Sequence, residues 1–312
     1  TEIYTLSLHD ALPIWRNQMK YVIGVMRPNF LLLAVACVFL GLAAAVYAGF
    51  EISVLGAVLC FVGGVLAHGA VNAFNEYEDI KSGLDFKTQR TPFSGGSGTI
   101  VPVPEKLPIA LWTAVICSLI CAGIGAYFAL TVGWWILLIG AIGLFVIVVY
   151  TPWFNKVPLL CLVSPGFGFG TLMVIGTYYC LTGSFSWTVL LASFIPFFLV
   201  SNLLLLNQFP DVEADQSVGR KHLPILIGRK ASAVIFALFE LFTYLVLIAG
   251  VAFGLFPAWA LLGLVSLVFA VPAALGALKN ADNLAKLGPS MGQNVLLNLI
   301  TPVLMGVGFL IG

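Results

Sequence analysis

Charged residues are scarce in this sequence: Asp, Glu, Lys and Arg fill 9% of its 312 positions, against about 25% in an average soluble domain. Hydrophobic residues fill 61%, and the mean hydropathy is +1.07. This composition excludes an ordinary soluble globular protein and predicts an all-α integral membrane protein. The net charge of +1 gives no reason to expect nucleic acid or an obligatory protein partner.

Metal-binding cysteine patterns and phosphate-binding loops are also absent. There is no Cys-x-x-Cys and no Cys/His spacing of the zinc type, so we interpret the cysteines as small hydrophobic residues. The glycine-rich "SGGSG" at 94–98 lacks the GxxxxGK[ST] pattern. It is interpreted as a flexible loop that can close over a site. The six cysteines are Cys37, Cys60, Cys117, Cys121, Cys161 and Cys180.

Long uncharged runs fill most of the chain, at 107–155, 157–210 and 287–312. A membrane span needs about 20 apolar residues, so the first two runs each hold two spans, divided by turn residues near Gly133 and Gly183. The segments 28–75 and 231–278 divide in the same way. The sequence therefore predicts nine transmembrane helices.

The cations fall in alternate connections of this nine-span arrangement. By the rule that cytoplasmic loops carry the positive charge, the N-terminus and these connections are predicted to be cytoplasmic, in the inner (cytoplasmic) membrane of the cell. The connections are the segment before span 1 (Arg16, Lys20, Arg27), 2–3 (Lys81, Lys87, Arg90, Lys106), 4–5 (Lys156), 6–7 (Arg220, Lys221, Arg229, Lys230) and 8–9 (Lys279, Lys286).

The first residues, "TEIYTLSLHDALPIW", fit neither a signal peptide nor a span. The string resembles a translated sequencing adapter. We expect residues 1–18 to be a non-native segment and residues 19–312 to form a single transmembrane domain.

Polar residues gather in a stripe at the end of the second span. His68, Asn72, Asn75 and Asp79 recur at spacings that place them on one helix face. Glu76 and Glu78 point off this face and are expected to be solvated.

A second stripe follows the sixth span, in "NQFPDVEAD". Asn207, Asp211 and Asp215 share a helix face there, and Glu213 points away from it. Each stripe is followed by cations. The first is followed by Asp85 and then by the cation Arg90, and the second is followed by Arg220 and Lys221. Acidic residues at helix ends can simply face water, but two matching clusters on one side suit Mg²⁺ ions around a diphosphate.

Here the sequence resembles the UbiA superfamily of intramembrane prenyltransferases, over nearly the whole chain from Met19. The two stripes resemble that superfamily's paired aspartate-rich motifs, and "RPNF" at 27–30 and "YTPWFNK" at 150–156 resemble other family positions. Two features depart from the pattern: Asp85 comes six residues after Asp79 instead of four, and His222 stands where Thr is usual. The "KSG" before Asp85 resembles the branch that prenylates dihydroxynaphthoate for menaquinone.

The resemblance implies a UbiA-like bundle and a role for each motif residue. Asp79, Asp211 and Asp215 are the expected catalytic residues. The expected Mg²⁺ ligands, direct or through water, are Asn75, Asp79, Asp85, Asn207, Asp211 and Asp215. The expected substrate-binding residues are Asn72, Asn75, Arg90, Tyr150, Lys156, Asn207, Arg220 and Lys221. Tyr150 is equally well explained as a membrane-interface anchor.

The implied reaction moves a prenyl chain from a polyprenyl diphosphate to an aromatic quinone precursor of the 1,4-dihydroxy-2-naphthoate type, with Mg²⁺ as cofactor. Other family acceptors remain alternatives: 4-hydroxybenzoate, homogentisate, a chlorophyllide or a glycerophosphate lipid. A secondary transporter is the alternative from another class, although transporters bind near the bilayer midplane. Glu240, inside a predicted span, is either functional or a buried hydrogen-bonding partner.

Overall fold

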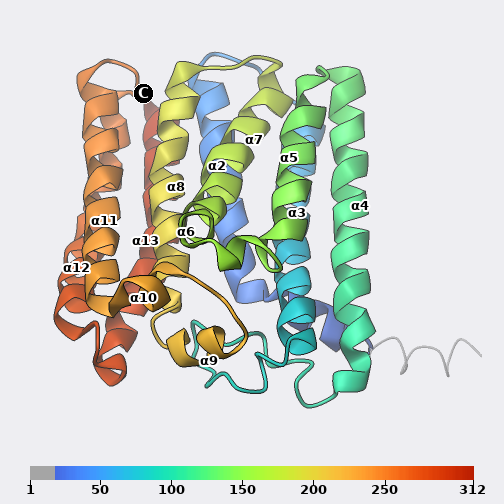
Figure 1. The fold of residues 1–312 in the computed structure, drawn as a ribbon. Coiled ribbons are helices and arrows are strands. Elements are labelled where there is room, and N and C mark those ends of the chain that lie inside the picture. The colour runs from blue at the N-terminus through green and yellow to red at the C-terminus, as the bar shows by residue number, and fades with distance from the viewer. Residues whose placement is uncertain (1–17) are drawn as a thin grey trace, which may run out of the picture.

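The computed structural model describes residues 18–312, and within them every regular element is helical (Figure 1). Residues 18–26 are also helical, and Arg27 separates them from the next helix with a left-handed φ of 54°. The predicted non-native segment lies, except for residue 18, outside the described residues. The elements are α2 (Pro28–Tyr47), α3 (Val54–Lys81), η1 (Pro104–Lys106), α4 (Leu107–Thr131), α5 (Trp135–Tyr150), η2 (Phe154–Lys156), α6 (Pro158–Gly166), η3 (Phe167–Leu172), α7 (Met173–Thr182), α8 (Trp187–Asn207), α9 (Val212–Ser217), α10 (Leu223–Leu226), α11 (Gly228–Ala252), η4 (Ala258–Ser266), α12 (Leu267–Asn280) and α13 (Leu284–Ile311).

Eight helical segments are long and apolar enough to cross a membrane, which makes this a multi-pass membrane protein. Three of them are composite: η1 with α4 forms the segment Pro104–Thr131, α6, η3 and α7 form Pro158–Thr182, and η4 with α12 forms Ala258–Asn280. The fourth predicted span is α5, a shorter apolar helix of 16 residues. The prediction of nine spans therefore depends on α5.

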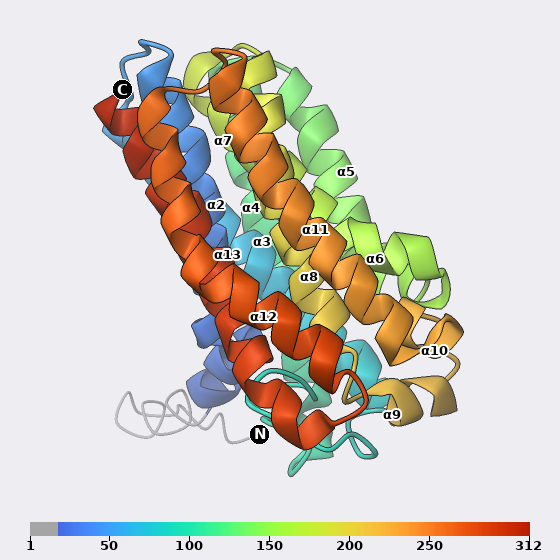
Figure 2. The ribbon, with the colours of Figure 1, turned by 90° about the vertical axis from the view of Figure 1, so that its left-hand side faces the viewer.

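The polar connections gather at one end of the bundle. The loop between α3 and α4, helices α9 and α10, and the turn between α12 and α13 all lie at the lower end in Figure 1, whereas the C-terminus lies at the opposite end. Figure 2 shows the same grouping after a quarter turn. The cytoplasmic orientation of this end stays a prediction.

Close packing in the bundle depends on small residues at particular crossings. The segment from Gly166 to Gly170 includes the first residues of the π-helical η3, and a β-carbon at either glycine would collide with the backbone of Phe197 in α8. The "SPGFGFG" run therefore brings two helix backbones together, as small residues do between membrane helices. This approach places η3 and its flanking residues beside α8, one wall of the site described below.

Glu240 is a buried hydrogen-bonding partner of the neighbouring helix. It is 3% exposed in α11, and Asn202 of α8 donates from Nδ2 to its Oε1 at 3.2 Å and to the carbonyl of Phe236 at 2.8 Å. It does not line the cavity described below. Of the two sequence interpretations, the structure favours the hydrogen-bonding role.

We expect the Glu240→Gln variant to have the thermal stability of the wild type in detergent, because the glutamine carbonyl can still accept a hydrogen bond from Asn202. Glu240→Ala should lose about 1–3 kcal/mol, since the amide donor then loses a buried partner. A glutamine variant that is as unstable as the alanine variant would show that the charge of Glu240 matters instead.

Candidate active site

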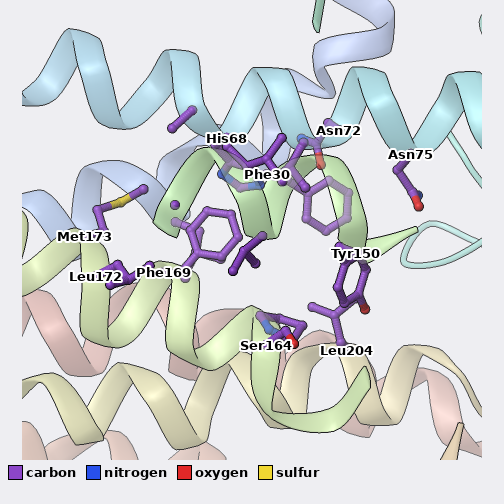
Figure 3. A pocket seen from close by; sticks show the side chains of 18 of the residues that line it. Phe30, His68, Asn72, Asn75, Tyr150, Ser164, Phe169, Leu172, Met173 and Leu204 are labelled. Atoms are coloured by element: carbon purple, nitrogen blue, oxygen red, sulfur yellow. The ribbon is translucent and has the colours of Figure 1, made fainter. Parts of the chain in front are cut away.

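A cavity of about 550 Å³ opens at the polar end of the bundle and extends far into it. Its walls come from α2, α3, α4, α5, the α6–η3–α7 segment and α8. Figure 3 shows the rings of Phe30, Tyr150 and Phe169 around one part of this space, with His68, Asn72 and Asn75 along α3. Deeper in, the lining becomes apolar and includes Phe128 and Ile136.

Both polar stripes line the mouth of this cavity. Segments more than a hundred residues apart in the sequence thus meet at one site, as the paired motifs predict. The motif residues that line it are Asn75, Asp79, Asp85, Asn207, Asp211 and Asp215.

Asp85 reaches the site through the turn that ends α3. Gly83 takes a left-handed φ of 77°, its amide bonds to the Ile80 carbonyl at 3.0 Å, and the Leu84 amide bonds to the Asp79 carbonyl at 2.8 Å. A glycine in this conformation reverses the chain at the helix end. The six-residue spacing from Asp79 to Asp85 is therefore compatible with one shared site.

Arg220 joins the two motifs directly. Its guanidinium donates to Oδ1 of Asp79 and, at 2.9 Å, to Oδ1 of Asp215. The side chains of both carboxylates are nearly buried, at 6% and 4% exposed. Burial alone would lower the pKa of Arg220, but the two carboxylates outweigh it and raise that pKa above its ordinary value. Arg220 therefore stays charged between the motifs.

Neither of the other two aspartates of the site, Asp85 and Asp211, forms an ion pair with a cation of residues 18–312. Burial, followed by the charges of Asp79 and Glu76, raises the pKa of Asp85 to about 7. Burial, followed by the charge of Asp215, raises the pKa of Asp211 to about 7 as well. A cation bound between these carboxylates would favour their ionised forms.

Three buried oxygens of the motifs have no hydrogen-bond donor within the described chain: Oδ2 of Asp85, Oδ1 of Asn207 and Oδ1 of Asp211. Buried acceptors without donors are uncommon, and carboxylate and amide oxygens are the ligands that Mg²⁺ prefers. Across residues 18–312, no three Asp, Glu, His or Cys side chains converge into a complete metal site. These donors thus fit Mg²⁺ that takes its remaining ligands from water and phosphate oxygens.

Asn75 and two further predicted site residues, Asn72 and Tyr150, line the cavity and help to shape it. Asn75 accepts a hydrogen bond from Thr151 at 3.0 Å. Asn72 donates to the carbonyl of Met26 at 2.8 Å, so its amide group ties α3 to the residue before Arg27. Tyr150 also lines the cavity, with its hydroxyl 4.0 Å from the Cys161 sulfur.

The remaining predicted substrate contacts lie outside the main cavity. Lys156 and Lys221 are exposed and do not line it. Arg90 is also exposed and lines a smaller neighbouring cavity of about 410 Å³ instead. Their roles in substrate binding stay predictions.

Glu76 corrects one sequence interpretation. It was expected to be solvated, but its side chain is fully buried and accepts hydrogen bonds from Ser97 in the loop that follows α3. Glu213, in contrast, is solvated as expected: its side chain is 72% exposed and pairs with Arg229 at 2.8 Å. Glu78 pairs with Lys81 at 3.9 Å and is 31% exposed.

Sequence reasoning missed His222 as a member of the site. Its ring is 1% exposed, it lines the cavity, and its Nε2 lies 2.9 Å from Oδ2 of Asp215. Its position in the sequence, directly after Arg220 and Lys221, could have indicated that it belongs to the site. His68 also lines the cavity, where its ring meets Phe169 edge to face at 4.5 Å.

Comparison with known proteins gives concordant results. The model of the UbiA prenyltransferase family matches residues 34–291. The 1,4-dihydroxy-2-naphthoate octaprenyltransferase of Bacillus subtilis (strain 168) is 28% identical over 248 residues, which cover 78% of this chain and 77% of that protein.

Two solved structures share the fold. The apo structure of a UbiA homolog from Aeropyrum pernix K1 matches with a TM-score of 0.66 and 20% identity, over 91% of this chain and 98% of that one. A UbiA homolog from Archaeoglobus fulgidus bound to DMAPP and Mg²⁺ matches with a TM-score of 0.54 and 15% identity, over 93% and 98%.

Proposed function

The chain belongs to the UbiA prenyltransferase family, and from this premise we propose that it transfers a prenyl chain from a polyprenyl diphosphate to an aromatic quinone precursor of the 1,4-dihydroxy-2-naphthoate type. The Bacillus subtilis relative supports this acceptor. The ligands of the Archaeoglobus fulgidus structure support a prenyl diphosphate and Mg²⁺. The alternative family acceptors stay open. The comparisons, which are with prenyltransferases and their homologs, give the transporter interpretation no support.

One observation carries this proposal: the cavity is acidic at its mouth and apolar in its depth. At the mouth, three motif oxygens lack donors from the described part of the chain, and Arg220 adds a positive charge. The lining extends from Tyr150 at the polar end of α5 to Ile136 near its other end, and the 14 residues of helix between them rise by about 21 Å. A ligand with a charged head and a long apolar tail matches this division.

Each part of the site then has a role. Asn75, Asp79, Asp85, Asn207, Asp211 and Asp215 would hold Mg²⁺, which when bound supplies Lewis acidity for the departing diphosphate. Arg220 offsets phosphate charge. The rings of Phe30, Tyr150 and Phe169 surround the space beside these groups (Figure 3), where their faces can stabilise an allylic cation.

The reaction is proposed to take place at the cytoplasmic end of an inner-membrane protein, within one domain over residues 19–312. The polar end of the bundle holds both motifs, and the cations Arg27 and Arg220 line the cavity beside them. A water-soluble acceptor and diphosphate would enter there, and the prenyl tail would lie among the apolar helices.

The direct test gives the purified protein an octaprenyl diphosphate, Mg²⁺ and 1,4-dihydroxy-2-naphthoate. We expect a prenylated naphthoate, detected by mass spectrometry, that disappears when EDTA removes the metal. Diphosphate release without coupled product would point to another acceptor from the family. No turnover with any of the named acceptors would overturn the proposal.

The length of the accepted chain should depend on Gly143. It lines the cavity from α5, and a β-carbon there would meet nothing within 4 Å. Gly143→Leu fills this space and should lower kcat/KM for octaprenyl diphosphate relative to geranyl diphosphate by about 10-fold or more, the effect of one or two misplaced methylenes.

Gly123→Leu is the matched control, because Gly123 lies on α4 outside the cavity lining and also has open space around it. Competition between the two diphosphates measures the preference. An unchanged preference in Gly143→Leu would show that the tail takes another path.

A further inference from the structure

Glu76 is a buried carboxylate beside the site that the reaction described above does not use. It is 0% exposed and follows Asn75 on α3, but it does not line the cavity. A buried carboxylate is costly unless it is paired and hydrogen-bonded. Its partners therefore indicate what it does.

Those partners come from two other segments of the chain. Ser97 donates its backbone amide to Oε2 at 2.8 Å and its hydroxyl to Oε1 at 2.6 Å. Arg27, directly before α2, donates to Oε2 at 3.2 Å. Hydrogen bonds to an ionised carboxylate are among the strong ones. Within residues 18–312, the side-chain hydrogen bonds that join loop 91–98 to α3 are the two from Ser97.

Loop 91–98 forms a wall of the cavity. Phe93, Ser94 and Gly96 line both the main cavity and the smaller one beside it. Gly96, with a φ of 71°, lies so close to Asp85 that a β-carbon would be 2.5 Å from its Oδ2. Holding Ser97 in place therefore holds Gly96 against a motif carboxylate.

We propose that Glu76 is a positioning residue that fastens loop 91–98 over the mouth of the cavity and so keeps water from the reacting prenyl group. This inference rests on the proposed prenyl transfer. Glu76 would act through Ser97 and the loop, not by touching the substrate.

The chemistry shows why such a closure matters. The allylic C–O bond breaks, its electron pair leaves with the diphosphate, and an allylic cation remains. In coupling, a ring carbon of the acceptor bonds to this cation and then loses its proton to diphosphate or solvent. If water bonds to the cation instead and loses a proton, the product is a free prenol. Exclusion of water from the site prevents this side reaction.

The test compares Glu76→Gln with Glu78→Gln, the same change two residues along α3, in the half-buried glutamate that pairs with Lys81. Glutamine at position 76 has one acceptor oxygen where the carboxylate has two, so it cannot accept from both the amide and the hydroxyl of Ser97 through separate oxygens, and it has no charge to pair with Arg27. We expect the ratio of free prenol to prenylated acceptor to rise roughly fivefold or more in Glu76→Gln, the effect of one lost hydrogen bond to a charged group, and to stay unchanged in Glu78→Gln.

A double-mutant cycle separates this role from a general loss of stability. Ser97→Ala should raise the prenol ratio on its own, and the double variant should show no further rise, because both changes break one contact. Amide hydrogen exchange over residues 91–100 should be faster in Glu76→Gln than in the wild type, whereas the exchange rate over α8 should be the same in both proteins. This readout needs no turnover.

The outcomes are distinct. If the wild-type protein couples no acceptor, the proposed function fails. If it couples and Glu76→Gln leaves both the product ratio and the exchange of the loop unchanged, the inference about Glu76 fails. Faster exchange with an unchanged ratio would also overturn it, because the loop would then be free without admitting water.

Discussion

Replacing Asp211 with alanine is expected to lower kcat/KM by roughly 100- to 1,000-fold, the usual cost of removing one preorganised electrostatic group from an active site. Asp211 lines the mouth of the cavity, and its Oδ1 has no donor within the described chain. That oxygen is therefore available to a metal ion. The loss should appear in product formation and in diphosphate release alike, because the residue would act before the acceptor does.

The same change should not destabilise the protein. Burial and the charge of Asp215 raise the pKa of Asp211 to about 7, so its ionisation opposes folding. This penalty is absent below the unfolded pKa and fully present above pH 7. At pH 8 without Mg²⁺, Asp211→Ala should unfold at the same temperature as the wild type or higher. Functional sites commonly trade stability for activity in this way.

Glu213→Ala is the control for Asp211→Ala, because Glu213 lies two residues away with a 72% exposed side chain. It should keep wild-type kcat/KM. If Asp211→Ala retained activity, the second motif would not bind the metal as proposed. If it unfolded at a much lower temperature, Asp211 would be a structural residue, and its loss of activity would say little about catalysis.

The helical spacing of the motifs predicts much of the site. Asn75 and Asp79 lie one turn apart on one face of α3, so a side chain that faces the cavity at one position implies the same at the other. The position of Asp85 was harder to predict, because it depends on the chain reversal at Gly83. Glycine permits that conformation without choosing its direction. The resemblance to a family supplied what spacing alone left open.

Glu76 shows why the rest could not be predicted. Its position one residue after Asn75 correctly places it off the motif face, and an uncovered helix end would leave it in water. Loop 91–98 instead folds back and buries it. Burial of that face is decided by a segment 21 residues further along the chain, which helix periodicity does not describe. Lys156 and Lys221 illustrate the converse, because closeness in sequence to a motif did not bring their side chains into the cavity.

Arg220→Gln is expected to lower both stability and activity, more than any other single change at the site. Arg220 bridges Asp79 and Asp215, and its removal leaves two nearly buried carboxylates facing each other. Breaking a buried ion pair by removing one partner costs about 3–5 kcal/mol. Arg220→Lys should recover only part of this, because an ammonium group lacks the planar fork that serves two carboxylates at once.

Mg²⁺ alone should restore more stability to Arg220→Gln than to the wild type, because the freed oxygens of Asp79 and Asp215 become cation ligands. Unfolding temperatures in detergent, with and without Mg²⁺, measure this difference. Lys230→Gln is the control, since Lys230 and Asp282 form an exposed pair with side chains 81% and 58% exposed, and such pairs contribute little. An equal Mg²⁺ effect in wild type and Arg220→Gln would mean that the oxygens freed from Arg220 do not bind the cation, because only the variant offers these two carboxylates free of their arginine.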